Sequence, residues 1–95
     1  MRLTSEYDDG LTLLISSSAS TTIPANDVQA VTTPPPTIPS GYKIIGLVYV
    51  YPHSAHFIVG ATSIGNDYTC STWVKNTKNQ AADVTLYVKF LARKE

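Results

Sequence analysis

The sequence predicts an all-β protein, a small antiparallel β-sandwich of the jelly-roll type with five to seven strands. Apolar and polar residues alternate with a period of two in several segments, and turn signals recur every 8 to 14 residues or so. No segment of useful length shows a helical period. A chain of 95 residues makes one domain. We expect residues 11–95 to form the sandwich and residues 1–10 to be a flexible or docking segment.

The clearest strand pattern lies almost at the carboxyl terminus, over residues 83–90. Apolar side chains occupy every second position there, at Val84, Leu86, Val88 and Phe90. Chain ends usually fray unless something ties them down. We therefore expect this strand to lie inside a sheet, with the alternating apolar residues in the core.

The amino-terminal half begins with two shorter strands. Residues 11–20 alternate, with Leu11, Leu13 and Ile15 on one face, and their Ser/Thr tail disfavours a helix. Pro24, Asn26 and Asp27 then predict a turn before a second strand over residues 28–33. A helical turn over residues 25–30, capped by Asn26 or Asp27, is the alternative.

A proline-rich segment follows over residues 34–41. Proline cannot donate to a sheet ladder and favours an extended conformation, and Ser40-Gly41 predicts a closing turn. Pro36-Thr37-Ile38-Pro39 matches the P-x-x-P pattern of a peptide ligand. No arginine flanks it and a strand begins at once, so a connector crossing from one sheet to another is favoured.

Residues 42–52 predict a strand that is covered on both sides. Ile44, Gly46, Val48 and Val50 fall on one face of a regular strand, and Lys43, Ile45, Leu47, Tyr49 and Tyr51 fall on the other. Two largely apolar faces are typical of a strand buried on both sides.

The remaining segments complete an antiparallel arrangement. Residues 57–65 and 67–77 predict two strands joined by a hairpin turn at Gly65-Asn66-Asp67, and residues 78–80 predict a turn into the final strand. Cys70, the one cysteine, lies in an alternating stretch and is expected to be a buried apolar residue. A single cysteine also excludes an internal disulfide.

Composition and charge exclude several partners. Seven basic and seven acidic residues cancel, which predicts no binding to nucleic acid or to an anionic membrane. No apolar run is long enough to predict membrane insertion, and the first ten residues do not read as a signal peptide. Between residues 10 and 66 only Asp27 and Lys43 carry a formal charge. Such a charge-poor chain suits packing against neighbouring subunits or work outside a cell.

The residues able to support chemistry are few. His53 and His56 form the single H-x-x-H pair. A zinc ion would need at least one further protein ligand. Cys70 and Asp67 are candidates for it only by elimination, because neither has a recognised metal-ligand spacing. We expect an exposed loop with no metal and no cofactor, although histidines of three chains could share an ion on an axis. No G-x-S-x-G nucleophile elbow occurs, so we expect no enzyme. The acidic residues Glu6, Asp8 and Asp9 read as a solvated patch.

Aromatic residues are the stronger functional signal, because Tyr and Trp concentrate at interfaces. They are compatible with a second half of the core, with a subunit contact or with a sugar-stacking site. The residues expected at a subunit interface are Tyr49, Tyr51, Trp73, Tyr87 and Leu91.

The carboxyl-terminal half carries three short motifs. A P-x-G-Y-x-x-(I/V)-G element comprises Pro39, Gly41, Tyr42, Ile45 and Gly46; a V-x-N element comprises Val74 and Asn76; a V-T-(L/V)-x-V-x-x-L element comprises Val84, Thr85, Leu86, Val88 and Leu91. In these motifs the chain resembles the carboxyl-terminal head domains of bacteriophage fibre and tail proteins. The resemblance covers roughly residues 37–95, and residues 11–33 fit the same sandwich more loosely.

This resemblance implies a homotrimeric β-sandwich on the virion, without enzymatic activity, that serves as a receptor-binding tip, head fibre or decoration. Other capsid or tail proteins, and glycan on the host surface, are the partners it implies. Tyr87 and Leu91 would face neighbouring subunits near a threefold axis. Such heads usually cap a long shaft, whereas about ten residues precede the first strand here, so the chain is either an excised domain or a small separate product.

The alternative function is a carbohydrate-binding module or adhesin domain that recognises cell-surface glycan. The position of the aromatic residues distinguishes the two. A cluster of Tyr and Trp in a shallow exterior groove favours glycan binding, and burial of the same residues between chains favours a structural role.

Overall fold

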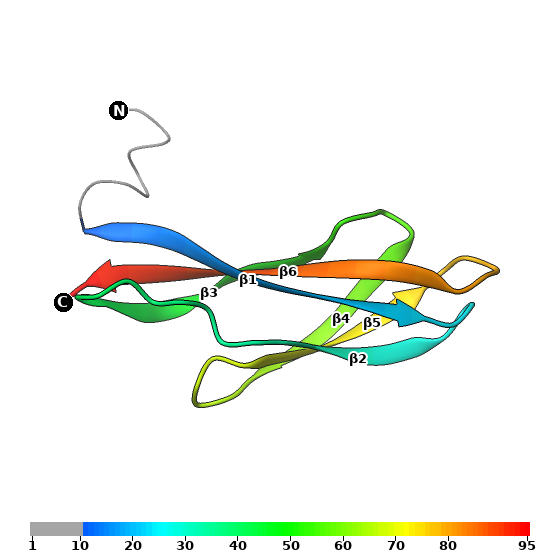
Figure 1. Ribbon diagram of the computed structural model, residues 1–95, viewed down its shortest axis with the longest axis horizontal. Coiled ribbons are helices and arrows are strands. Elements are labelled where there is room, and N and C mark those ends of the chain that lie inside the picture. Colours follow the sequence, from blue (N-terminus) through cyan, green and yellow to red (C-terminus); the bar gives the residue numbers. More distant parts are fainter. Residues whose placement is uncertain (1–10) are drawn as a thin grey trace.

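The computed structural model describes residues 11–95, which form six antiparallel strands arranged as two three-stranded sheets (Figure 1). The all-β sandwich is therefore confirmed. The expectations for residues 1–10, including the acidic patch, lie outside the described residues. Within residues 11–95 there is no helix, and hence none that could cross a membrane.

The first sheet, called the β6 sheet, has the order β1-β6-β3. It consists of β1 (Thr12–Ile23), β6 (Ala82–Lys94) and β3 (Tyr42–Pro52). β6 lies in the middle, as its regular alternation predicts. β1 pairs with it without interruption, from Thr12 opposite Arg93 to Ile23 opposite Ala82. The carboxyl-terminal strand is thus held along both of its edges.

The second sheet, called the β5 sheet, has the order β2-β5-β4. It consists of β2 (Val28–Thr33), β5 (Cys70–Asn76) and β4 (Phe57–Ile64). The strand over residues 28–33 is confirmed, and the helical alternative is wrong. Residues 34–39 form no strand and connect β2 of this sheet to β3 of the other, as expected of the proline-rich segment.

The core lies between the sheets in two adjoining clusters. β6 contributes residues to both clusters. Its inward side chains are almost fully buried: Val84, Leu86, Val88, Phe90 and Ala92. From the β5 sheet, Cys70 packs into one cluster and Val74 into the other. The predicted core face of β6 and the burial of Cys70 are confirmed.

Asn76 is a buried polar residue that joins several loops at one end of the sandwich. Its side-chain Nδ2 donates to the carbonyl oxygens of Ile23 and Gln80, both at 3.0 Å. Its Oδ1 accepts from the backbone N–H of Lys78 at 2.9 Å. The side chain is fully buried, and these bonds offset the cost of removing its polar atoms from water.

The predicted strand over residues 42–52 is confirmed as β3, but the assignment of its side chains to two alternating faces is wrong at Leu47. β3 is an edge strand, and two β-bulges, between Ile44 and Gly46 and between Leu47 and Tyr49, interrupt its pairing with β6. Each bulge inserts one extra residue and shifts the alternation. Leu47 therefore packs in the same core cluster as Ile44, although a regular strand would place them on opposite faces. Val48 remains 44% exposed, so this strand is not covered on both sides within the single chain.

Candidate functional site

One outer face of the molecule carries a row of stacked tyrosines. Tyr51 lies between Tyr49 and Tyr87, with ring centroids 5.2 Å and 5.1 Å away and interplanar angles of 26° and 24°. Tyr51 and Tyr87 are directly opposite each other on β3 and β6, on the side of the β6 sheet away from the core. Because the rings stack on one another, they form one continuous aromatic surface.

The same face continues through a pair of leucines. Leu91 lies opposite Leu14 on the neighbouring strand, and both are half-buried. We call this surface the tyrosine face, and its residues are Leu14, Tyr49, Tyr51, Tyr87, Lys89 and Leu91. Lys89 lies opposite Tyr49, between Tyr87 and Leu91 along β6. The structure thus brings four of the five predicted interface residues together on one surface.

The fifth predicted residue, Trp73, lies on the opposite side of the sandwich. It is 53% exposed on the outer face of the β5 sheet. Its neighbours are small: Ala30 faces it on β2, and a β4 irregularity leaves Gly60 and Ala61 beside it. A Cβ added at Gly60 would lie 3.5 Å from the Trp73 Cβ. With no large side chain on either flank, the indole stays open to solvent.

A second row of side chains crosses the same outer face next to Trp73. In the strand register Lys75 lies between Val28 on β2 and Ile58 on β4. Val28 is 47% exposed and Ile58 is 58% exposed. We call this surface the tryptophan face, and its residues are Val28, Ala30, Ile58, Gly60, Trp73 and Lys75. It ends in a polar row of Thr32, Ser71 and Ser63.

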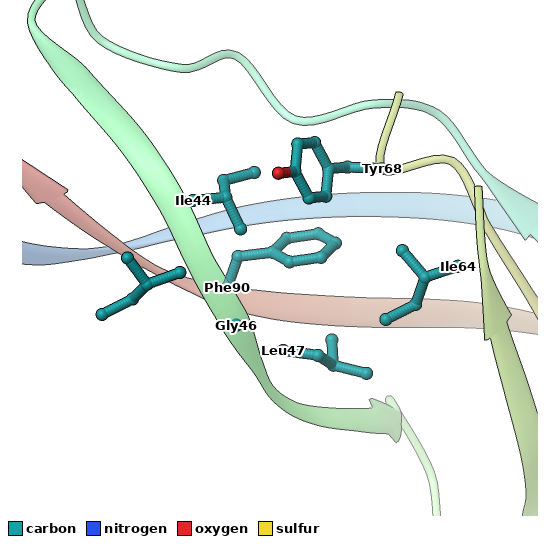
Figure 2. A pocket seen from close by; sticks show the side chains of 7 residues that line it. Ile44, Gly46, Leu47, Ile64, Tyr68 and Phe90 are labelled. Carbon is teal, nitrogen blue, oxygen red and sulfur yellow. The ribbon is translucent and has the colours of Figure 1, made fainter. Parts of the chain in front are cut away.

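An apolar hollow lies between β3 and the β4–β5 hairpin (Figure 2). It has a volume of about 120 Å³. We call it the edge hollow, and its lining residues are Ile44, Ile45, Gly46, Leu47, Ile64, Tyr68 and Phe90. Side chains of the β6 sheet face Ile64 of β4 and Tyr68 of the β4–β5 hairpin across this space. The first β3 bulge and the missing side chain of Gly46 help to leave the space unfilled.

The hairpin turn fixes the position of Tyr68 beside this hollow. The Gly65 N–H donates to Thr69 O at 2.8 Å, and the Tyr68 N–H donates to Gly65 O at 3.0 Å. Tyr68 adopts φ 68°, a left-handed conformation that is rare for a bulky residue. The predicted hairpin is confirmed, but β5 begins only at Cys70, because residues through Thr69 belong to the turn.

Asp67 stabilises the same turn. Its Oδ1 accepts a hydrogen bond from the Thr69 N–H at 3.0 Å. This backbone bond, with help from the Thr69 hydroxyl, holds the pKa of Asp67 below its usual value. The side chain is solvent-exposed and stays ionised at neutral pH, so a fixed negative charge lies at the hairpin next to Tyr68.

A polar hollow of about 370 Å³ lies on the β6 sheet, lined by Ser20, Thr21, Thr22, Asp83 and Thr85. The Ser20 and Thr85 hydroxyls share a hydrogen bond of 2.8 Å, and the Thr22 hydroxyl donates to Asp83. Sequence reasoning missed this site. Its β1 residues and its β6 residues are more than 60 positions apart along the chain, and only the β1–β6 register brings the two groups together.

The histidines lie in an exposed loop, as expected. The Nδ1 atom of His53 accepts a hydrogen bond from the Thr85 N–H at 2.9 Å, and its ring packs against Phe57 at 5.8 Å. Among residues 11–95, no three His, Cys, Asp or Glu side chains gather closely enough to hold a metal ion. Cys70, one candidate ligand, lies in the core, where burial raises the pKa of its thiol.

The chain matches no protein-family model, no curated protein and no solved structure.

Proposed function

We propose that the chain is a non-enzymatic structural module of a bacteriophage virion, a trimeric fibre head or a decoration attached to the capsid or tail. The motifs around Gly41, Asn76 and Leu86 that resemble phage head domains support this proposal. The β-sandwich is the fold class that the resemblance implies. In this role the partners are two further copies of the chain and other virion proteins.

The exposed side chains on the two outer faces carry the proposal. Tyr49 on the tyrosine face is 46% exposed and Trp73 on the tryptophan face is 53% exposed. Contiguous apolar patches are uncommon on monomers and mark interaction surfaces. Two different patches on one chain favour head-to-tail contacts, which close into a ring, over a two-fold contact that uses one patch twice.

The mass of the protein in solution tests this proposal. Light scattering behind a sizing column should give three times the chain mass of 10.3 kDa. Tyr49→Ser and Trp73→Ser should each lower that mass, because they remove aromatic area from the contact. Thr32→Ala, in the polar row of the tryptophan face, is the matched control and should leave the trimer intact. A monomeric wild-type protein would contradict the proposal.

A glycan-binding module is the second candidate, and the polar hollow favours it. Hydroxyls and the Asp83 carboxylate line this hollow, and Tyr87 lies two residues along β6 from Thr85 on the same face. Polar groups beside an aromatic ring suit recognition of a sugar. Asp83→Ala should abolish binding in a screen against cell-surface glycans while leaving the solution mass unchanged. Absence of any glycan bound through this face would remove the candidate.

A further inference from the structure

The edge hollow is the size of a single side chain. Small-molecule pockets commonly measure about 300–1,000 Å³. The edge hollow, at about 120 Å³, is well below that range. A cavity of about 150 Å³ lined by Leu, Ile and Phe binds benzene. The edge hollow, with a similar lining, therefore suits one aliphatic group and is too small for a metabolite or for an indole ring.

The backbone around the hollow is held in conformations that cost free energy. Tyr68 keeps a left-handed φ of 68°, and β3 bulges at the residues that line the opposite wall. Strained residues of this kind cluster at binding sites, and bulges often re-aim strands near them. The exposed Ile45 and Ile64, at 50% and 45%, extend the apolar surface around the opening.

We propose that the edge hollow is a socket for the side chain of Ile58 from a second copy of the chain. This inference rests on the trimer proposed above and names one of its contacts. Ile58 is 58% exposed and has the branched aliphatic shape that the hollow accommodates. It lies on the tryptophan face, whereas the socket lies at the edge formed by β3 and the hairpin.

Charge complementarity supports a second copy as the occupant. Lys75 lies beside Ile58 in the register of the tryptophan face. Asp67 lies next to Tyr68 at the socket, and its side chain is solvent-exposed. Insertion of Ile58 would bring this lysine towards the hairpin, where the carboxylate provides a partner of opposite sign. Such pairs orient an interface and help to fix its register.

The contact is heterologous, because socket and inserted side chain belong to different surfaces of the same chain. Each copy would offer Ile58 to one neighbour and its edge hollow to another. Repetition of a heterologous contact gives a closed ring when the rotation allows it. The proposal therefore supplies a contact that a ring of three copies could repeat at every subunit boundary.

The dissociation constant of the trimer, measured by sedimentation equilibrium on the full chain, tests the socket. Ile58→Ser removes the inserted side chain, and Ile64→Asp places a charge at the socket. Each should weaken association about tenfold or more, as expected of a buried anchor at an interface. The double variant should be no weaker than the more severe single variant. Val48→Ser, which changes an aliphatic residue outside the hollow that is about as exposed as Ile64, should stay within about twofold.

A charge exchange provides a second readout. Lys75→Asp and Asp67→Lys should each weaken association, and the two together should restore most of it. A wild-type trimer that tolerates Ile58→Ser and Ile64→Asp would overturn the socket and leave the proposed trimer standing. A monomeric wild-type chain would overturn both.

Discussion

The ring of Tyr68 packs edge-on against the ring of Phe90, with centroids 5.9 Å apart and planes at 72°. This contact joins the β4–β5 hairpin to the central strand of the opposite sheet. It forms although the Tyr68 backbone occupies the left-handed region, which costs an L-residue about 1–2 kcal/mol. The turn hydrogen bonds around Gly65 and Thr69 hold the backbone in that conformation.

Three substitutions at Tyr68 should separate the backbone strain from the ring contact. Tyr68→Phe keeps the ring and should change the free energy of unfolding by less than about 0.5 kcal/mol. Tyr68→Ala should destabilise the fold by about 1–2 kcal/mol through loss of the aromatic contact. Tyr68→Gly should be more stable than Tyr68→Ala by about 1 kcal/mol, because glycine adopts positive φ freely. Urea denaturation measures all three, and equal stability of the Ala and Gly variants would refute the strain.

Asn76→Ala should destabilise the protein by about 3 kcal/mol. The substitution removes the donor to the Ile23 and Gln80 carbonyls and the acceptor for the Lys78 N–H, and unpaired buried groups cost about 1–3 kcal/mol each. Asn79→Ala, at an exposed position in the same loop region, is the control and should be nearly neutral. A loss below about 1 kcal/mol by urea denaturation would show that water replaces these bonds.

The Cys70 thiol should be unreactive in the folded protein. Burial raises its pKa, which disfavours the nucleophilic thiolate, although the nearby Thr33 hydroxyl opposes this shift. Iodoacetamide at pH 8.5 should modify Cys70 only in denaturant. Fast alkylation of the native protein would contradict the buried position.

The same thiol should make stability fall at alkaline pH. Below the pKa of the unfolded thiol both states keep the proton, so the thiol has no effect there. Above it the unfolded state loses the proton first and is favoured until the folded thiol also ionises. Cys70→Ala should abolish this part of the decline in the free energy of unfolding. An identical alkaline slope in both proteins would assign the decline to other groups.

Asp67 should contribute stability that is lost in acid. Hydrogen bonds from Thr69 lower its pKa in the folded state, so the contribution is present above the unfolded pKa of about 3.9 and disappears as the pH falls through the folded pKa. Asp67→Asn should therefore be less stable than the wild type at pH 7 and should approach it near pH 2. Thermal unfolding across this range measures the difference. A gap that stays constant with pH would show that the charge has no role.

The success of sequence reasoning depends on how regular each strand is. β6 pairs along its length with β1, and its period-two alternation correctly placed Leu86 and Phe90 in the core. In β3 the same reasoning failed at Leu47, since each bulge inserts a residue and moves the following side chains to the other face. An isolated glycine inside a strand pattern suggests a bulge, and Gly46 and Gly60 both lie at such irregularities. The side chains that a bulge moves depend on how the partner strand is paired, which the sequence of one strand does not show.

For the candidate surfaces, too, the sequence predicts individual residues but not how they are grouped in space. The aromatic residues expected at an interface could be chosen from the sequence because they alternate with core residues along their strands. Their grouping in space could not be predicted from the sequence, because Tyr51 and Tyr87 meet only through the β3–β6 register, and Trp73 belongs to the other sheet. The polar hollow at Asp83 and the edge hollow at Tyr68 likewise form between segments far apart in sequence.

The sequence by itself determined the all-β class, the turns, the buried position of Cys70 and the inward face of β6. Each of these depends on local chemistry: alternation of apolar residues, the restricted backbone of proline, or the short polar residues of a turn. Only the tertiary structure decided the strand order, the exposed face of β3, the separation of Trp73 from the tyrosines and the two hollows. These features depend on which distant strands pair and in which register. That pairing minimises the free energy of the whole core, and no single segment of the sequence contains enough information to specify it.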